Sequence, residues 1–369
     1  MKVIVFTADE NNGGIKQFTI KVFESCLNNG YDSTLFIPNI KSIEIPDQIS
    51  DKTIRYKKQK DILGITPAII KTAKQINEIK PDVVYLTDDA MYSIQVMKRI
   101  KKGIRVIMTM HDITQHPGKM SIKRRFLTFI STTFYRKIAF KRFDNIITLS
   151  DNSRDRLVKQ YPKIENKILT FKLGAHPPLS ASPHKPIELN NMSETKFLLV
   201  FGRIQKYKGI FRTINAFNSL TDNKEYSLVV AGNGSLTEEE KNGALINSKI
   251  YLINRFINDD EMVWLFQNST YVVLSYIEAS QSGVIPMAYH FGKPVVASNI
   301  DGLKEFVEES KTGYLFDNDD NFKDILHFIV TDSCACYQQL CNNCLRYEND
   351  FLNWNKNMKT IIEKDAVNN

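Results

Sequence analysis

Short apolar runs alternate along the chain with segments whose apolar residues recur at helical spacing, and this alternation occurs in two series. The first series has apolar runs at 2–8, 31–37, 82–87, 104–110 and 145–149. The second has them at 196–201, 226–231, 249–253, 271–275 and 294–297. Near-continuous apolar runs between helices are typical of a parallel sheet covered on both faces. The pattern therefore predicts two α/β domains, which bind ligands at the carboxyl ends of their strands.

The stretch between the two series differs in composition. Residues 174–194 are rich in Pro and Ser and show no periodicity, which indicates an interdomain linker. We expect an N-terminal, acceptor-side domain at 1–178, a linker at 179–194 and a C-terminal, donor-binding domain at 195–350. Helical spacing of apolar residues in 351–369 predicts a last helix that packs back on the N-terminal domain.

Charge is distributed unevenly over the 369 residues. Residues 1–180 carry 31 Lys+Arg against 17 Asp+Glu, whereas the remainder carries 18 against 24, within a total of +8. An anionic partner is therefore expected for the first half only: nucleic acid, a membrane surface or a phosphorylated substrate. No apolar run reaches the roughly 18 residues of a membrane-spanning helix. The apolar start of the chain is typical of a strand, not a secretory signal, so we expect a cytoplasmic protein.

The basic segment 119–143 contains eight Lys/Arg and no Asp or Glu, and its apolar residues recur every four positions. This pattern favours a basic amphipathic helix that lies on an anionic membrane, peripheral to the inner face of the cell membrane. A domain helix with one buried stripe and one solvated face would show the same periodicity, and this alternative stays open. No nucleic-acid-binding motif accompanies the charge, so no nucleic-acid partner is expected.

Four of the five cysteines are clustered, at Cys334, Cys336, Cys341 and Cys344. Their CxC and CxxC spacing is compatible with zinc. Their helical spacing and the lack of a nearby histidine instead favour the apolar stripe of a buried helix, and we expect no metal there.

Two stretches of the second half place phosphate-binding chemistry at strand ends. In GRIQKYKGI (202–210), Gly202 ends the strand 196–201, and Arg203 and Lys208 then flank a short loop, where the two cations suit a diphosphate. Taken alone, the two would be solvated surface charges.

The stretch 276–298 follows the strand 271–275. Its small-residue loop 280–283 precedes a predicted helix at 284–291, so backbone N–H groups can approach a phosphate closely. Glu278, just before that loop, can accept hydrogen bonds from sugar hydroxyls.

These stretches are similar to the donor-site motifs of the retaining GT-B glycosyltransferases, the "glycosyl transferase group 1" or family-4-like enzymes. The resemblance continues, in the expected order, through NNGGI (11–15), MHD (110–112), LVVAGNG (228–234), INRFI (253–257) and DGLKEFVEESKTGYLF (301–316). It implies a GT-B fold, in which two facing Rossmann-like domains enclose an interdomain cleft.

The resemblance also implies roles for individual residues. Arg203 and Lys208 would neutralise the donor diphosphate, Glu278 would position the sugar, and His111, oriented by Asp112, would face the sugar from the other domain. The implied donor-binding residues are Gly13, Gly14, Arg255, Phe256, Ser282, Gly283 and Val284; the glycines and 282–284 approach the phosphates, and Arg255 and Phe256 border the nucleobase. A nucleotide diphosphate sugar is the implied co-substrate, with no metal or other cofactor, because protein cations stabilise the leaving group.

The chain departs from the family at one position. The family signature has two glutamates separated by seven residues, and the second position, which binds ribose, falls at Met287. Ribose recognition therefore has no assigned residue. No GxGxxG fingerprint follows the first strand, which weakens an oxidoreductase interpretation.

We expect a retaining enzyme that moves a hexose from a UDP- or GDP-sugar to a glycan acceptor, which would be lipid-linked, in surface polysaccharide biosynthesis (lipopolysaccharide, capsule or O-antigen). Two alternatives remain: a non-catalytic protein of the same fold that binds sugar nucleotides or glycans, which Met287 favours, and a nucleotide-sugar epimerase.

Overall fold

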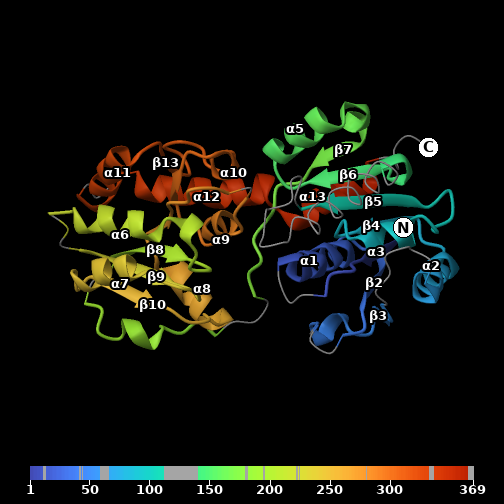
Figure 1. Cartoon of the computed structure of the whole chain (residues 1–369), viewed down its shortest axis with the longest axis horizontal. Coiled ribbons are helices and arrows are strands. Elements are labelled where there is room, and N and C mark those ends of the chain that lie inside the picture. The colour runs from blue at the N-terminus through green and yellow to red at the C-terminus, as the bar shows by residue number, and fades with distance from the viewer. Residues whose placement is uncertain are drawn as a thin grey trace, which may run out of the picture. The chain divides into compact units, whose positions relative to one another are not determined.

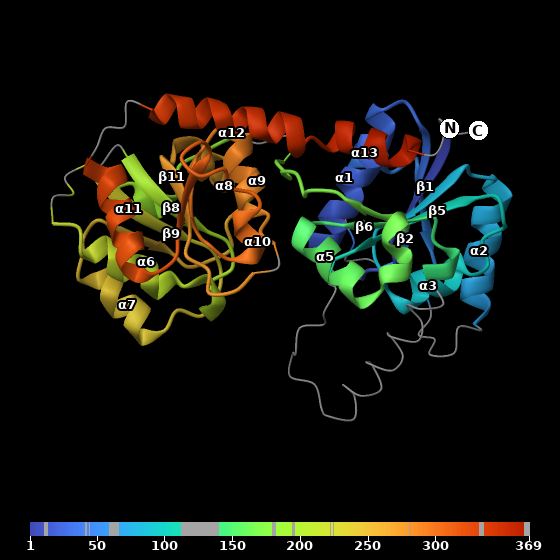
Figure 2. The same ribbon diagram turned by 90° about the horizontal axis from the view of Figure 1, so that it is seen from above.

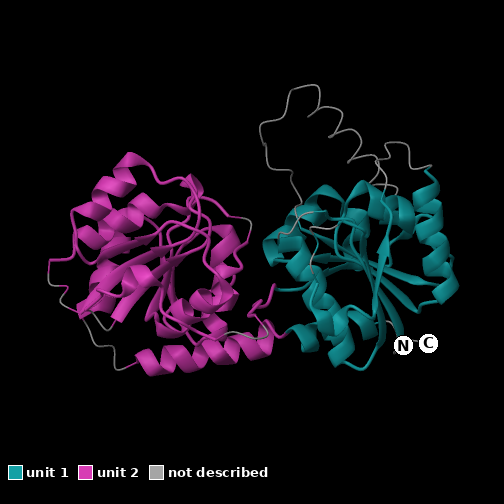
Figure 3. Ribbon diagram, turned by 90° about the horizontal axis from the view of Figure 1, so that it is seen from below, with its two compact units in different colours: residues 1–172, 354–369 teal, residues 173–353 magenta. Residues whose placement is uncertain are grey.

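The computed structural model describes residues 1–10, 14–40, 43, 45–58, 66–111, 140–178, 182–193, 196–221, 223, 225–279, 281–331 and 336–364. The chain divides into two compact units (Figure 3). Unit 1 consists of residues 1–172 and 354–369, and unit 2 of residues 173–353. The chain thus leaves unit 1 after Lys172 and returns to it at Trp354.

The described strands of unit 1 form one parallel sheet in the order β3-β2-β1-β4-β5-β6-β7. Their bounds are β1 Lys2–Phe6, β2 Asp32–Pro38, β3 Thr53–Tyr56, β4 Val83–Leu86, β5 Arg105–Met110, β6 Asn145–Thr148 and β7 Ile168–Thr170. Side chains on both faces of the central strands are buried, which is why these segments are apolar without alternation.

Helices cover both faces of this sheet. Helices α2 (Pro67–Ile79), α3 (Met91–Met97) and α5 (Asp151–Gln160) contribute to the hydrophobic core on one face. Helix α1 (Gly14–Asn28) packs against α13 (Trp354–Glu363) on the other, as Figure 2 shows. Short 3-10 turns occupy η1 (Asp47–Ile49) and η2 (Pro162–Lys167).

Unit 2, shown in Figure 1, contains a second parallel sheet. Its described strands follow the order β10-β9-β8-β11-β12-β13. Their bounds are β8 Lys196–Phe201, β9 Tyr226–Ala231, β10 Ile250–Ile253, β11 Tyr271–Leu274, β12 Val295–Ser298 and β13 Gly313–Phe316. The order reverses between β8 and β11, and at such a switch point open α/β sheets bind ligands beyond the carboxyl ends of their strands.

The helices of unit 2 build a separate core on each face. Helices α6 (Ile210–Asn218), α7 (Glu238–Leu245) and α11 (Asp319–Thr331) cover one face. Helices α8 (Asp259–Asn268), α9 (Val284–His290), α10 (Asp301–Lys304) and α12 (Tyr337–Phe351) cover the other. The 3-10 turns are η3 (Ile187–Leu189) and η4 (Lys206–Lys208). The predicted fold class, two parallel-sheet α/β domains, is confirmed.

Two of the clustered cysteines are described on helix α12. Cys344 is fully buried in the core that α9 also lines, and its Sγ donates a hydrogen bond to the backbone oxygen of Thr312 at 3.4 Å. Burial raises the pKa of the Cys344 thiol. This placement follows the buried-stripe interpretation for Cys344, while Cys334 lies outside the described residues.

Several predicted features also lie outside the described residues. They include Gly13, Asp112 and positions 119–139 of the basic segment. In the described ranges, no helix combines the length and apolarity that crossing a bilayer requires.

Candidate active site

The turn that follows β8 directs the side chain of Lys208 back to the end of that strand. Gly202 has φ +106°, and a Cβ there would come within 2.9 Å of Lys208 Nζ. Gly209 has φ +63°, and a Cβ there would meet the backbone oxygen of Ser275 at 2.0 Å. Glycine is favoured at both ends of the turn, because the positive φ would strain another residue, and a side chain at position 209 would also collide with the backbone of Ser275.

Lys208 is a buried cation, with only 6% of its surface exposed. Its Nζ donates hydrogen bonds to Tyr276 Oη at 2.7 Å and to the backbone oxygen of Phe201 at 3.3 Å. The Tyr276 ring centroid lies 4.6 Å from Nζ. Within the part of the chain that the structure describes, Lys208 forms no ion pair with a carboxylate. Desolvation accordingly lowers the pKa of Lys208 below its ordinary 10.5.

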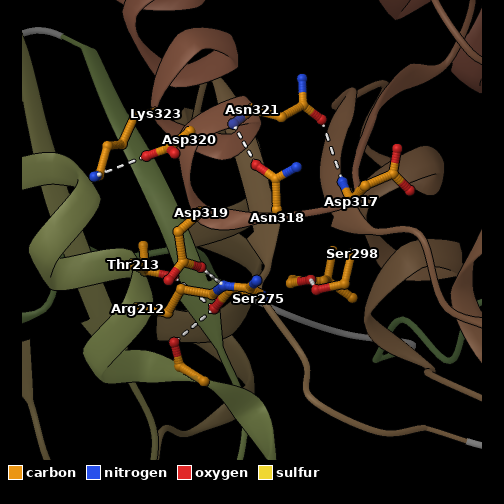
Figure 4. Close-up of polar contacts among 12 residues, drawn as sticks. Arg212, Thr213, Ser275, Ser298, Asp317, Asn318, Asp319, Asp320, Asn321 and Lys323 are labelled. Carbon is orange, nitrogen blue, oxygen red and sulfur yellow. Dashed lines mark hydrogen bonds and ion pairs between the residues drawn. The ribbon is translucent and has the colours of Figure 1, made fainter.

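The backbone of this turn is anchored to the end of β11. The hydroxyl of Ser275 lies 3.1 Å from the backbone oxygen of Lys208 and 2.8 Å from that of Gly209. Thr213 Oγ1 of helix α6 lies 2.6 Å from the same hydroxyl, and Figure 4 shows the two side chains pointing toward each other. The amide of Ile277 donates to the backbone oxygen of Tyr207 at 2.7 Å. These bonds fix the position from which Lys208 extends.

The small-residue loop before α9 joins the same group. Ser282 is buried, and its Oγ lies 3.3 Å from Tyr276 Oη and accepts a 3.3 Å hydrogen bond from the amide of Val284. Gly283 is exposed at the start of α9, and nothing lies within 4 Å of where its Cβ would be. The structure thus brings the end of the first predicted motif (Lys208) and the loop of the second (Ser282–Val284) together through Tyr276.

Two other predicted residues, Arg203 and Glu278, stand at the edge of this group. Arg203 follows Gly202 directly, and both it and Glu278 are exposed. Neither forms a hydrogen bond or ion pair with another described residue. Both side chains are therefore free to meet a ligand in solvent.

Arg255 has a different environment from the one expected. Its guanidinium makes paired hydrogen bonds of 2.8 Å with Glu188 and of 2.7 Å with Glu261, and a 3.2 Å bond with the backbone oxygen of Phe256. All five N–H donors of the guanidinium are used in these bonds. The bonds, with those to Glu261 first, raise the pKa of Arg255. Arg255 thus secures the turn before α8, whereas the neighbouring Phe256 leaves 77% of its surface exposed.

In unit 1, His111 follows β5. Its Nε2 lies 2.8 Å from the backbone oxygen of Thr87. A carbonyl only accepts, so Nε2 carries a proton and Nδ1 remains for other contacts. The Phe18 ring of α1 meets the imidazole edge-on, with centroids 5.0 Å apart. Gly14 begins α1, and a Cβ there would meet nothing within 4 Å.

The position that holds a second glutamate in the family is occupied by an apolar side chain. Met287 is buried in the hydrophobic core beneath α9. It offers no hydrogen-bonding group comparable to a carboxylate, so this position does not supply the expected ribose contact.

A cavity of about 890 Å³ lies on the α6–α7–α11 side of the same sheet. Its lining includes Lys206, Gly209, Arg212, Tyr276 and Asp319, but not Lys208, Arg203 or residues 282–284. Arg212 and Asp319 form an ion pair at its edge, as Figure 4 shows. Because Tyr276 contacts Lys208 and also lines this cavity, the cavity adjoins the candidate site.

The sequence patterns did not reveal Tyr276, Glu188 or Glu261 as parts of these arrangements. Tyr276 comes two residues after the end of β11, at the carboxyl edge of the sheet, and this placement is a usable signal. Glu188 lies 67 residues from Arg255 in the 3-10 turn η3, and nothing local marks it. Glu261 carries the signal of a capping box with Asn258, which explains only its backbone role.

The two sheets, with cations and a helix start at the carboxyl edge of the second, are the architecture of a GT-B glycosyltransferase. Residues 183–347 match the family model described as "Glycosyl transferases group 1", and residues 12–177 match that described as "Glycosyltransferase Family 4". Since the two matches together span most of its length, this chain belongs to the group 1 glycosyltransferases.

The chain is also similar in sequence to curated proteins, one a named mannosyltransferase and one uncharacterized. An alpha-1,3/1,6-mannosyltransferase, ALG2 of Dictyostelium discoideum, is 26% identical over 49% of this chain and 50% of its own length. An uncharacterized 41.2 kDa protein in the cps region of Klebsiella pneumoniae is 22% identical over 92% of this chain and 94% of its own. The chain spans about half the length of the first curated relatives it matches.

Two solved structures illustrate the likeness in fold. A glycosyltransferase from Rickettsia africae has a TM-score of 0.74 at 17% identity, covering 100% of this chain and 99% of its own. HepE of Anabaena in complex with UDP has a TM-score of 0.73 at 15% identity, covering all of both chains.

Proposed function

We propose that this enzyme is a retaining hexosyltransferase that uses a UDP- or GDP-sugar and a lipid-linked glycan acceptor in surface polysaccharide biosynthesis. The unpaired, buried ammonium of Lys208 carries the proposal. Burying a charge without a counter-charge costs several kcal/mol, so such a group is typically retained for a ligand that supplies the opposite charge. A diphosphate beside Lys208 would be that ligand.

The relatives support the choice of substrates. HepE has been crystallised with UDP and with UDP-glucose. The structure of the lipopolysaccharide outer core galactosyltransferase WaaB has a TM-score of 0.70 with this chain, and the Klebsiella relative comes from a cps region. These names favour a nucleotide-sugar donor and a role in surface glycans.

In the proposed reaction, the bond between the anomeric carbon and the donor diphosphate breaks, and the acceptor oxygen forms a new bond on the same face of the sugar. The acceptor proton passes to an oxygen of the departing diphosphate. Lys208, Arg203 and the amides at Ser282–Val284 stabilise the charge that develops on this leaving group. Glu278 positions the sugar, and His111 contacts it.

The remaining roles in this proposal belong to the other donor-binding residues. Gly13 and Gly14 would approach the phosphates, and the exposed Phe256 would contact the nucleobase. Because its donors are all used, we assign Arg255 to holding the turn that presents Phe256. No metal is required in this proposal, since protein cations neutralise the diphosphate, and transfer should continue in the presence of EDTA.

The basic segment 119–143 would hold the enzyme at an anionic membrane surface, where a lipid-linked acceptor is found. Each Lys or Arg near such a surface contributes about 1 kcal/mol.

A thermal-shift panel of UDP-, GDP- and ADP-sugars tests the proposal. The cognate donor should raise the Tm by several degrees through preferential binding to the folded state. Absence of a shift with every nucleotide sugar would contradict it. An assay without acceptor then separates transfer from epimerisation or hydrolysis of the donor.

A further inference from the structure

In the hydrogen bonds among Lys208, Tyr276 and Ser282, the donor and the acceptor of each bond can be assigned. An ammonium only donates hydrogen bonds, so Tyr276 Oη accepts the 2.7 Å bond from Lys208 Nζ. The phenol therefore has its own hydrogen available for another acceptor. Burial raises the pKa of Tyr276 to about 12, so the phenol keeps this hydrogen at neutral pH.

Ser282 is the acceptor that the geometry offers to that hydrogen. Its Oγ lies 3.3 Å from Tyr276 Oη. The same Oγ also accepts from the amide of Val284 at 3.3 Å. With both lone pairs occupied, the Ser282 hydroxyl can act only as a donor, and no described residue accepts its hydrogen.

Lys208 is in a similar position. Two of its three N–H groups donate, to Tyr276 and to the backbone oxygen of Phe201. Among the described residues, nothing accepts the third. The group thus holds two unused hydrogens, one on Lys208 and one on Ser282, with no carboxylate beside either.

We infer that Tyr276 is a positioning residue that orients the Lys208 ammonium and the Ser282 side-chain hydroxyl as two donors to one phosphate group of the donor substrate. The inference rests on the proposed function and adds a side-chain donor at Ser282 to the backbone amides there. Hydrogen-bond chains polarise in one direction, so the charge on Lys208 strengthens the O–H donors of Tyr276 and Ser282.

The test compares Tyr276→Phe with the wild type in isothermal titration. The probes are UDP or GDP, whichever the wild type binds more tightly, and the corresponding nucleoside, uridine or guanosine. The variant keeps the ring but loses the hydroxyl, and its Kd for the diphosphate should rise about tenfold, as expected for a bond to a charged group. The Kd for the nucleoside should not change, a pattern that a general structural defect would not produce.

Tyr271→Phe is the matched control. Tyr271 is buried at the start of β11, the strand that precedes Tyr276. Its hydroxyl has no hydrogen-bond partner among the described residues. Its removal should leave both dissociation constants unchanged.

Ser282→Ala gives a second, independent measurement, which also decides the matter if Tyr276→Phe fails to fold. It should weaken diphosphate binding about tenfold by itself. In the double variant with Tyr276→Phe, the affinity for the diphosphate should fall by much less than the roughly hundredfold expected for two independent effects. The reason is that both substitutions interrupt the same series of hydrogen bonds.

Unchanged diphosphate binding in Tyr276→Phe or in Ser282→Ala, or equal losses for diphosphate and nucleoside, would overturn the inference while the proposed function stands. If the wild type binds neither UDP nor GDP, the proposed function fails, and the inference fails with it.

Discussion

The Nζ of Lys208 lies 2.7 Å from Oη of Tyr276, although the two residues are 68 positions apart in the chain. One follows β8 and the other β11, and these strands are neighbours where the strand order reverses. Parallel strands bring their carboxyl ends to one edge, so the topology places a cation and its hydrogen-bond acceptor at the point where such folds bind ligands.

The first prediction concerns stability without ligand. Lys208→Met replaces a buried, unpaired charge with an apolar side chain of similar length. The change removes a desolvation cost, so the free energy of unfolding should rise by about 1 kcal/mol, and the Tm by about 2–4 °C.

Differential scanning calorimetry of the ligand-free protein measures this effect. Lys206→Met is the control, because Lys206 is exposed on the same turn and its loss should leave the Tm unchanged. A lower Tm for Lys208→Met would show that the fold itself needs this charge.

The second prediction is the pH dependence of binding. Burial lowers the pKa of Lys208, so its proton is lost at a lower pH than the ordinary 10.5. The affinity for a nucleoside diphosphate should therefore be highest below that lowered pKa and fall as pH rises through it, by up to about tenfold per pH unit.

Titration calorimetry from about pH 7 to about pH 10 tests this, since the range covers a lowered lysine pKa. The free energy of unfolding should change in the opposite direction to the affinity. Because the pKa of Lys208 is lowered in the folded protein, the unfolded chain binds more protons at this side chain. The free energy of unfolding of the wild type, relative to that of Lys208→Met, should therefore increase as pH rises. In Lys208→Arg the charge persists, and binding by that variant should be flat. A flat wild-type profile would exclude Lys208 as the titrating contact.

The third prediction concerns the nucleobase. Phe256→Ala should raise the Kd for UDP or GDP about tenfold, within the usual range for aromatic stacking, and leave the Kd for inorganic pyrophosphate unchanged. Leu245→Ala is the control, because Leu245 is an equally exposed apolar side chain of unit 2. An equal rise in the Kd for pyrophosphate would show that Phe256 does not contact the nucleobase.

The fourth prediction concerns the membrane. Replacing Lys123, Arg124 and Arg125 with Gln should release the protein from vesicles that contain anionic phospholipid, since about 1 kcal/mol is lost per charge. Sedimentation with vesicles measures the bound fraction. Replacing Lys71, Lys74 and Lys80 with Gln changes the net charge by the same amount and should have little effect on the bound fraction. Equal release by both triple variants would indicate that only net charge matters.

The sequence was sufficient to predict the two sheets, because strands buried on both faces must be apolar throughout. It also indicated Lys208, since a cation in a short loop after a strand-end glycine suits a diphosphate. The environments of the side chains were not predictable. Arg255 is held by Glu188, a residue of the 3-10 turn η3 that is 67 positions away, and the role of Tyr276 depends on the pairing of β8 with β11.

The most direct test of the central claim is titration calorimetry of UDP and GDP against the wild type, Lys208→Met and Lys206→Met. If the buried ammonium binds the diphosphate, the wild type and Lys206→Met should bind one of the two with similar affinity. Lys208→Met should then bind it at least about a hundredfold more weakly, as expected for loss of a charged contact in a dry site. Equal affinity in all three proteins would contradict the account.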